Sequence, residues 1–204
     1  LPYTYALMII GTLALTGFPL LSGFYSKDAI IEFAYLSGTT TGYYAAGIGI
    51  FTAFLTSIYS WRLIFKTFHG KYNNKKINIE ETHESPLIML IPLIILSTGA
   101  IFAGFIFKDL FIGYEGINNF WNESIFFLEP LSTDHPPLWF LILTPTLVIL
   151  SIPFAYYLFV KNKNFPTQLV NINKPLYEFL FNKWYFDEIY DVLFVKSSKR
   201  FGLF

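Results

Sequence analysis

The chain has 204 residues, of which 54% are apolar and 21% aromatic, and its 14 basic side chains balance its 14 acidic ones. Only 14% of the residues are charged, where about a quarter is usual for a soluble protein. This composition indicates a protein that uses lipid as its solvent, and the neutral balance gives no general attraction to nucleic acid. Because the sequence has no cysteine, it excludes disulfides and thiolate-ligated iron–sulfur clusters within the chain.

Four apolar segments reach or approach the roughly 20 residues that a membrane-spanning helix needs. They cover residues 2–36, 43–68, 86–107 and 138–160. We therefore predict an all-α fold, a polytopic transmembrane helix bundle with about four crossings over residues 1–165. Residues 166–204 are aromatic but regularly charged, and we predict an amphipathic segment there.

The first apolar segment contains a predicted break near residues 17–28. A continuous helix over the whole segment would be about 50 Å long, whereas the hydrocarbon core is about 30 Å thick. Gly17, Pro19 and Gly23 favour a break, since Pro19 lacks an amide hydrogen and its ring clashes with the Leu15 carbonyl in a regular helix. Broken helices recur at the ion sites of transporters.

Carbonyl groups that such a break frees in lipid must find hydrogen-bond partners. The hydroxyls of Thr16, Ser22 and Ser26 are the candidate partners in this stretch, together with water. Such irregular backbone persists at membrane depth only where protein buries it or a water-filled cavity meets it.

Lys27 follows the predicted break and is the main candidate for a functional residue. An ammonium in hydrocarbon is costly, so such a lysine is expected to face the bundle interior, where desolvation makes its neutral form accessible and allows proton transfer. Asp28 lies about 100° further around the helix, and Glu32 shares the face of Asp28; both are weaker candidates. A second interpretation stays open, in which Lys27 lies at the membrane interface and its amine snorkels to water.

The charges of the connecting segments indicate an orientation. Bases gather between the second and third spans and after the fourth, whereas the loop at residues 108–137 is mainly acidic. The positive-inside rule places the basic side in the cytoplasm or matrix, which requires the first segment to cross once. Arg62 lies near that end of the second span, where snorkelling is the default interpretation and a charged half-channel the weaker one.

The three histidines are not predicted to bind metal or cofactor. His69 is interpreted as an interface residue rather than a proton relay. His83 and His135 lie in loops and lack the spacing of metal ligands. Glu81 and Glu84 flank His83, and we expect both to belong to a solvated loop.

The tail contains the spacing of an amphipathic helix. Phe186, Ile189, Tyr190 and Leu193 recur at i, i+3, i+4 and i+7. The helix is predicted to lie at the membrane interface or against a partner, and its mixed charges favour docking to a protein.

The sequence LALTGFPLLSGFYSKDAI at residues 13–30 resembles the broken-helix motif of the antiporter-like subunits of respiratory complex I, which are related to Mrp-type sodium/proton antiporter subunits. The resemblance continues at residues 54–70, 83–86 and 184–196. The last of these is similar to the region that leads into the long lateral helix of the largest, distal antiporter-like subunit. The resemblance implies that the chain is roughly the last third of a longer polypeptide.

The resemblance further implies a membrane subunit of proton-pumping NADH:quinone oxidoreductase, in which Lys27 matches a lysine of the proton path. An Mrp-type sodium/proton antiporter subunit is the alternative. NADH, FMN, iron–sulfur clusters and quinone would be bound by other subunits, so we expect no redox site or cofactor in this chain. Its partners would be the other membrane subunits and lipid, in a bacterial inner membrane or a mitochondrial inner membrane.

Overall fold

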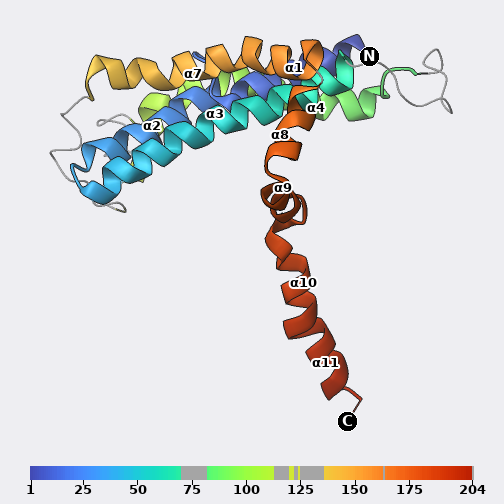
Figure 1. Ribbon diagram of the computed structural model, residues 1–204. Coiled ribbons are helices and arrows are strands. Elements are labelled where there is room, and N and C mark those ends of the chain that lie inside the picture. Colours follow the sequence, from blue (N-terminus) through green and yellow to red (C-terminus); the bar gives the residue numbers. More distant parts are fainter. Residues whose placement is uncertain (70–81, 113–119, 122–123, 125–135, 163, 204) are drawn as a thin grey trace. The chain divides into compact units, whose positions relative to one another are not determined.

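The computed structural model describes residues 1–69, 82–112, 120–121, 124, 136–162 and 164–203. They form two compact units, Leu1–Lys161 and Asn162–Phe204. The helices of the first unit are α1 (Pro2–Thr16), α2 (Ser22–Leu36), α3 (Thr40–Phe68), α4 (Leu87–Phe111) and α7 (Leu138–Tyr156), which the π-helical η2 (Tyr157–Lys161) continues (Figure 1).

Three helical stretches within the described residues are long and apolar enough to cross a membrane. They are Thr40–Phe68, Leu87–Phe111 and Leu138–Lys161. The first of them, α3, has 29 residues, which corresponds to about 43 Å of helix. These helices confirm the predicted all-α, polytopic membrane class.

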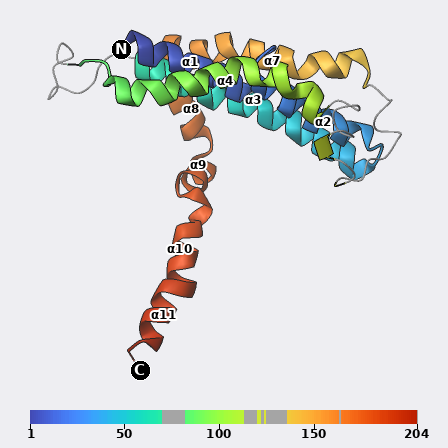
Figure 2. The same cartoon turned by 180° about the vertical axis from the view of Figure 1, so that it is seen from behind.

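The first apolar segment runs along the bundle as two consecutive helices, α1 and α2, beside α3 and α4 (Figure 2). At one end of the bundle the Tyr5 hydroxyl of α1 lies 2.8 Å from Nε2 of His69, directly after α3. At the other end the Tyr35 ring of α2 lies 4.3 Å from the Phe140 ring of α7. The segment therefore traverses the bundle once, as the alternation of the loop charges requires.

Small, buried residues form the contact between α3 and α7. The hydroxyls of Ser57 and Ser151 hydrogen-bond to each other across this contact, and Ser151 also donates to the Val148 carbonyl at 2.6 Å. Small side chains let helices approach closely in lipid, where no hydrophobic force drives them together. This packing fixes α3, against which both α1 and α2 lie.

Ser22 joins the start of α2 to the middle of α4. Its hydroxyl donates to the carbonyls of Gly99 and Ala100, both at 2.9 Å, and accepts the Gly104 N–H at 3.0 Å. Gly104 permits the approach, because a Cβ there would lie 2.4 Å from the Ser22 Cα. The expectation that Ser22 serves the broken first helix is therefore wrong, since its hydroxyl is used by another helix.

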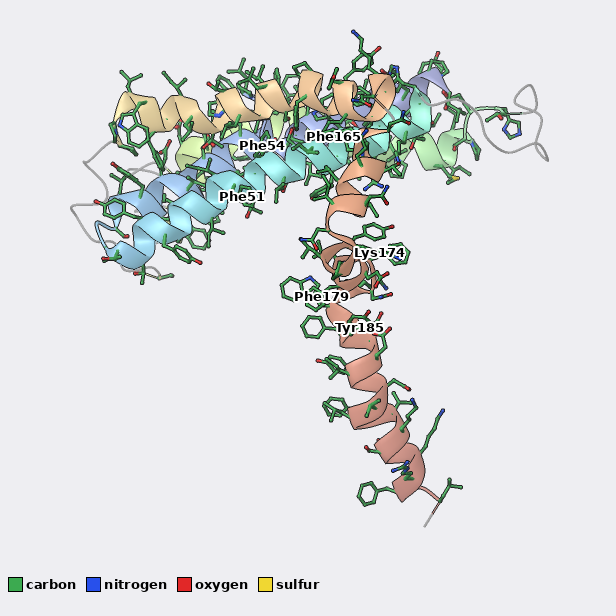
Figure 3. All side chains as sticks on the ribbon, in the orientation of Figure 1. Phe51, Phe54, Phe165, Lys174, Phe179 and Tyr185 are labelled. Atoms are coloured by element: carbon green, nitrogen blue, oxygen red, sulfur yellow. The ribbon has the colours of Figure 1, made fainter. Side chains whose placement is uncertain are left out.

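The second unit is a series of short helices. These are α8 (Phe165–Ile172), α9 (Lys174–Phe181), the left-handed turn η3 (Lys183–Tyr185), α10 (Phe186–Tyr190), the π-helical η4 (Asp191–Val195) and α11 (Lys196–Phe201). Positive φ angles of 51°, 63° and 57° at Lys183, Trp184 and Tyr185 separate α9 from α10. The Phe179 and Tyr185 rings lie 6.4 Å apart at this bend (Figure 3).

The second unit carries surface ion pairs and exposed aromatic side chains. Lys196 pairs with Asp191 at 2.8 Å, and Lys183 pairs with Asp187 at 3.3 Å. None of the described residues of this unit is buried. The predicted amphipathic spacing begins in α10, but the wider turn of η4 changes its register. Docking of this surface to lipid or protein stays a prediction.

Candidate functional site

The helix break begins at a left-handed glycine. Gly17 follows α1 with φ 81° and donates its N–H to the Ala14 carbonyl at 3.2 Å. Phe18 donates to the Leu13 carbonyl at 3.0 Å. These two bonds form a Schellman motif, which satisfies two of the carbonyls that a helix end exposes. Neither of these two bonds involves the Leu15 carbonyl.

Residues 17–21 connect α1 to α2. Pro19 lies in this connection, where it cannot donate a hydrogen bond and so cannot continue the helix. Leu20 adopts a positive φ of 73°, a conformation that residues with a Cβ seldom adopt. The helix is therefore interrupted for five residues before α2 begins.

Gly23 lies in the first turn of α2, beyond the connection itself. A Cβ at Gly23 would lie 1.8 Å from the Ala14 carbonyl oxygen. The last turn of α1 and the first turn of α2 are therefore in direct backbone contact. Lys27 lies four residues after Gly23, on the same face of α2, so this contact directs Lys27 toward the end of α1.

The Lys27 amine binds the end of α1. Its Nζ donates to the Leu15 carbonyl at 3.2 Å, and its aliphatic stem passes Gly17, where a Cβ would lie 3.4 Å from the Lys27 Cδ. The carbonyl end of a helix carries partial negative charge and favours a cation. The hydrogen bond to this end carbonyl of α1 therefore comes from the Lys27 amine of α2, where the sequence had suggested a hydroxyl.

The remaining hydroxyls near the break bond within their own helices. Thr16 donates to the Leu13 carbonyl at 3.1 Å, and Ser26 donates to the Gly23 carbonyl at 3.4 Å. Thr16 thus provides a hydroxyl to one of the last carbonyls of α1, as suggested, whereas Ser26 bonds within α2 and does not serve the end of α1. Each reaches a carbonyl three residues earlier, a local contact that needs no second helix.

An open groove of about 450 Å³ lies between α2 and α3 beside Lys27. Its wall is mostly apolar and includes Ile30, Ile31 and Ile48. Lys27 is the charged member of the lining that the structure describes, and Tyr44 contributes a polar side chain. The amine therefore lies between a helix carbonyl and a surface that offers little solvation to a charge.

Asp28 and Glu32 follow Lys27 on α2 and are both partly buried. Asp28 is the immediate neighbour of Lys27, and Glu32 lies one turn further along the helix. A second cation approaches α2 from α4, where the Lys108 Nζ lies 5.5 Å from the centre of the Tyr25 ring. The ionisable groups near the break thus come from two helices.

Arg62 lies apart from this cluster. Its side chain is exposed, and its guanidinium carbon lies 5.7 Å from the Phe159 ring centre. Thr52 lines the groove beside Lys27, and Arg62 follows ten residues later, about 15 Å further along α3. The structure therefore brings Lys27, Asp28 and Glu32 together on one helix and leaves Arg62 near the opposite end of α3.

The histidines lie outside the helix break. His69 is exposed, bonds to Tyr5, and has its ring edge-on to that of Phe65 at 5.7 Å. His83 is exposed, and His135 lies outside the described residues. In the described part of the chain, no three His, Asp or Glu side chains converge as a metal-binding group would require.

Glu84 binds the start of α1. Its Oε1 accepts the Tyr3 N–H at 2.8 Å, and its Oε2 accepts the Thr4 hydroxyl at 2.7 Å. The hydrogen bond from the Thr4 hydroxyl is the main cause that lowers the pKa of the Glu84 carboxyl below its ordinary value of 4.5, and backbone N–H groups add to it. The expectation of a solvated loop is wrong for Glu84, and Glu81 lies outside the described residues. Eighty residues separate the partners, so no local pattern could reveal them.

Helices of membrane-spanning length around an interrupted helix define a polytopic α-helical membrane protein. A family model for the C-terminus of NADH dehydrogenase subunit 5 matches residues 59–204, most of the chain, and one for the transmembrane region of NADH:quinone oxidoreductase and Mrp antiporters matches residues 1–56. The chain belongs to the family of NADH dehydrogenase subunit 5 C-termini.

Relatives named NADH-ubiquinone oxidoreductase chain 5 are similar to nearly the whole chain. The protein from Marchantia polymorpha is 37% identical over 99% of this chain and 31% of its own length. The protein from Chondrus crispus is 42% identical over 99% of this chain and 32% of its own length. The protein from Phytophthora infestans is 41% identical over 93% of this chain and 29% of its own length. The chain thus spans about a third of the length of these relatives.

The contact of Glu84 with α1 predicts a pH-dependent contribution to stability. The pKa of its carboxyl is lower in the folded than in the unfolded chain, so the contribution is complete above the ordinary value of 4.5 and is lost as the pH falls through the folded pKa. We expect Glu84→Gln to lower the melting temperature of the purified full-length protein by a few degrees at neutral pH. This difference should stay constant down to about pH 5.5 and shrink in more acidic buffer.

Glu178→Gln is the control for that measurement. Glu178 is an exposed carboxylate that pairs with Lys174 at 3.9 Å, and such surface pairs contribute little to stability. Its replacement should leave the melting temperature unchanged at every pH. Equal melting temperatures of wild type and Glu84→Gln at neutral pH would contradict the role assigned to Glu84.

Proposed function

We propose that this chain forms the C-terminal part of an antiporter-like membrane subunit of proton-pumping NADH:quinone oxidoreductase, and that Lys27 carries protons through it. The observation that supports the role of Lys27 is the hydrogen bond from its amine to the Leu15 carbonyl, across an interrupted membrane helix. An amine at such a place can hold a proton and release it to a neighbour. Asp28 and Glu32 are the nearest such neighbours on the same helix.

Electron transfer is assigned to other subunits in this proposal. NADH, FMN, iron–sulfur clusters and quinone would be bound there, and the lack of cysteine in this sequence agrees with that division. The other membrane subunits and lipid would cover the exposed apolar faces of the bundle. The complex would lie in a bacterial inner membrane or a mitochondrial inner membrane.

An Mrp-type sodium/proton antiporter subunit is the second candidate. The match of residues 1–56 favours it as much as the first, because that family model covers both kinds of protein. The match of residues 59–204 favours the oxidoreductase. NADH oxidation by the purified complex that contains this chain would distinguish the two, since an Mrp-type complex performs no redox chemistry.

Proton pumping by the Lys27→Ala variant tests the role of the lysine. The complete complex is reconstituted in vesicles, and the protons pumped per NADH oxidised are compared with those of the wild type. We expect a lower ratio with normal assembly, because alanine cannot carry a proton. Lys66→Ala is the matched control, since it removes an exposed lysine in the last turn of α3, away from the break. An unchanged ratio in Lys27→Ala would remove this lysine from the mechanism.

A further inference from the structure

The carbonyl that receives the Lys27 amine is left open by the way in which α1 ends. The N–H groups of Gly17 and Phe18 occupy the carbonyls of Ala14 and Leu13 and do not extend to Leu15. In a continued α-helix the Leu15 carbonyl would accept the N–H of residue 19. Residue 19 is a proline and has no N–H. The Leu15 carbonyl therefore stays available to a donor from another helix.

The position of Lys27 is set by backbone contact. Gly23 lies against Ala14, and Lys27 follows one turn later on the same face of α2. Its stem passes Gly17 before its Nζ reaches the Leu15 oxygen at 3.2 Å. Gly17 and Gly23, which were predicted to interrupt the helix, therefore also determine where the Lys27 amine lies.

The acceptor in this contact is a backbone carbonyl, which carries no titratable proton. The ionisable groups nearest to it come from three helices. Asp28 and Glu32 lie on α2. Lys108 of α4 lies over the Tyr25 ring of α2, and Tyr44 of α3 lines the groove. The sequences of α1 and α7 contain no charged residue. A carbonyl at the negative end of a helix binds an ammonium more strongly than a neutral amine, because charge strengthens the hydrogen bond. The Leu15 carbonyl thus favours the proton-loaded form of the side chain.

We infer that Pro19 is a positioning residue, which keeps the Leu15 carbonyl free and thereby holds the Lys27 amine at the helix break while it carries its proton. This inference rests on the proposed function of Lys27. It assigns to the proline a role beyond the interruption of the helix, because the missing N–H of the proline also leaves the carbonyl that the amine reaches without a backbone donor. Replacement of the proline would supply an N–H that can compete with the Lys27 amine for the Leu15 carbonyl.

Proton pumping by a Pro19→Ala variant, measured against pH in vesicles with the assembled complex, tests the inference. Without the Leu15 carbonyl, which stabilises its ammonium form, Lys27 releases its proton more readily. The alkaline limb of the pumping profile should therefore move toward lower pH by about one unit. Pro92→Ala is the matched control, since it restores an N–H inside α4, a different helix. Its profile should coincide with that of the wild type.

The outcomes separate this inference from the proposed function. If Lys27→Ala stops pumping but an assembled Pro19→Ala complex keeps the wild-type pH profile, the positioning role is overturned and the role of Lys27 stands. If Lys27→Ala pumps normally, the proposed function fails and the inference fails with it. If Pro19→Ala does not assemble, Pro19→Gly takes its place, because glycine supplies the N–H without promoting helix. The same shift of the profile is then expected.

Discussion

Gly23→Ala is expected to prevent stable assembly of the bundle. The added Cβ would lie 1.8 Å from the carbonyl oxygen of Ala14 and 2.9 Å from its carbonyl carbon. These are backbone atoms, so rotation of a side chain cannot relieve the clash, and α1 and α2 must separate. Overpacking of this kind costs about 1–3 kcal/mol or more. The separation would also draw Lys27 away from the Leu15 carbonyl.

The amount of assembled complex in the membrane and its melting temperature would measure this effect. Gly11→Ala in α1 is the matched control, because a Cβ at Gly11 would meet no described heavy atom within 4 Å apart from its chain neighbours and the backbone of its own helix. Alanine also has the higher helix propensity, so Gly11→Ala should assemble at least as well as the wild type. Wild-type assembly and melting temperature in Gly23→Ala would show that α1 and α2 do not meet at this glycine.

Lys27→Arg is expected to abolish most proton transfer although it keeps the positive charge. The ordinary pKa of a guanidinium lies at least about two units above that of a lysine amine, so its neutral form is at least about a hundredfold rarer. Arginine can still donate to the Leu15 carbonyl, and the break should therefore stay intact. A group that seldom releases its proton should slow transfer by at least about tenfold at neutral pH.

Vesicle pumping per NADH oxidised, measured beside assembly, is the relevant test for this variant. Lys66→Arg makes the same exchange at an exposed position in the last turn of α3 and should pump as the wild type does. Full pumping by Lys27→Arg would mean that charge alone is required at this position. The titration of the amine would then have no part in the mechanism.

Local sequence features predicted much of the helical architecture. The lengths of the apolar segments at 43–68, 86–107 and 138–160 correspond closely to α3, α4 and α7 with its continuation. Glycine and proline at residues 17–19 predicted an interruption, because their backbone preferences act within a few residues. The tail was less predictable, since the left-handed turn at Lys183–Tyr185 has no glycine to mark it.

The contacts between distant segments were decided by the tertiary structure. Ser22 and Glu84 each bind a partner about 80 residues away, and a pattern with a period of two to four residues carries no information on such pairs. The sequence by itself determined a membrane-spanning helical chain with an interrupted first segment and a lysine beside the interruption. Only the packing of α2 against α1 decided that this lysine binds the Leu15 carbonyl, because the acceptor is chosen by which backbone atoms lie within reach once the two helices meet.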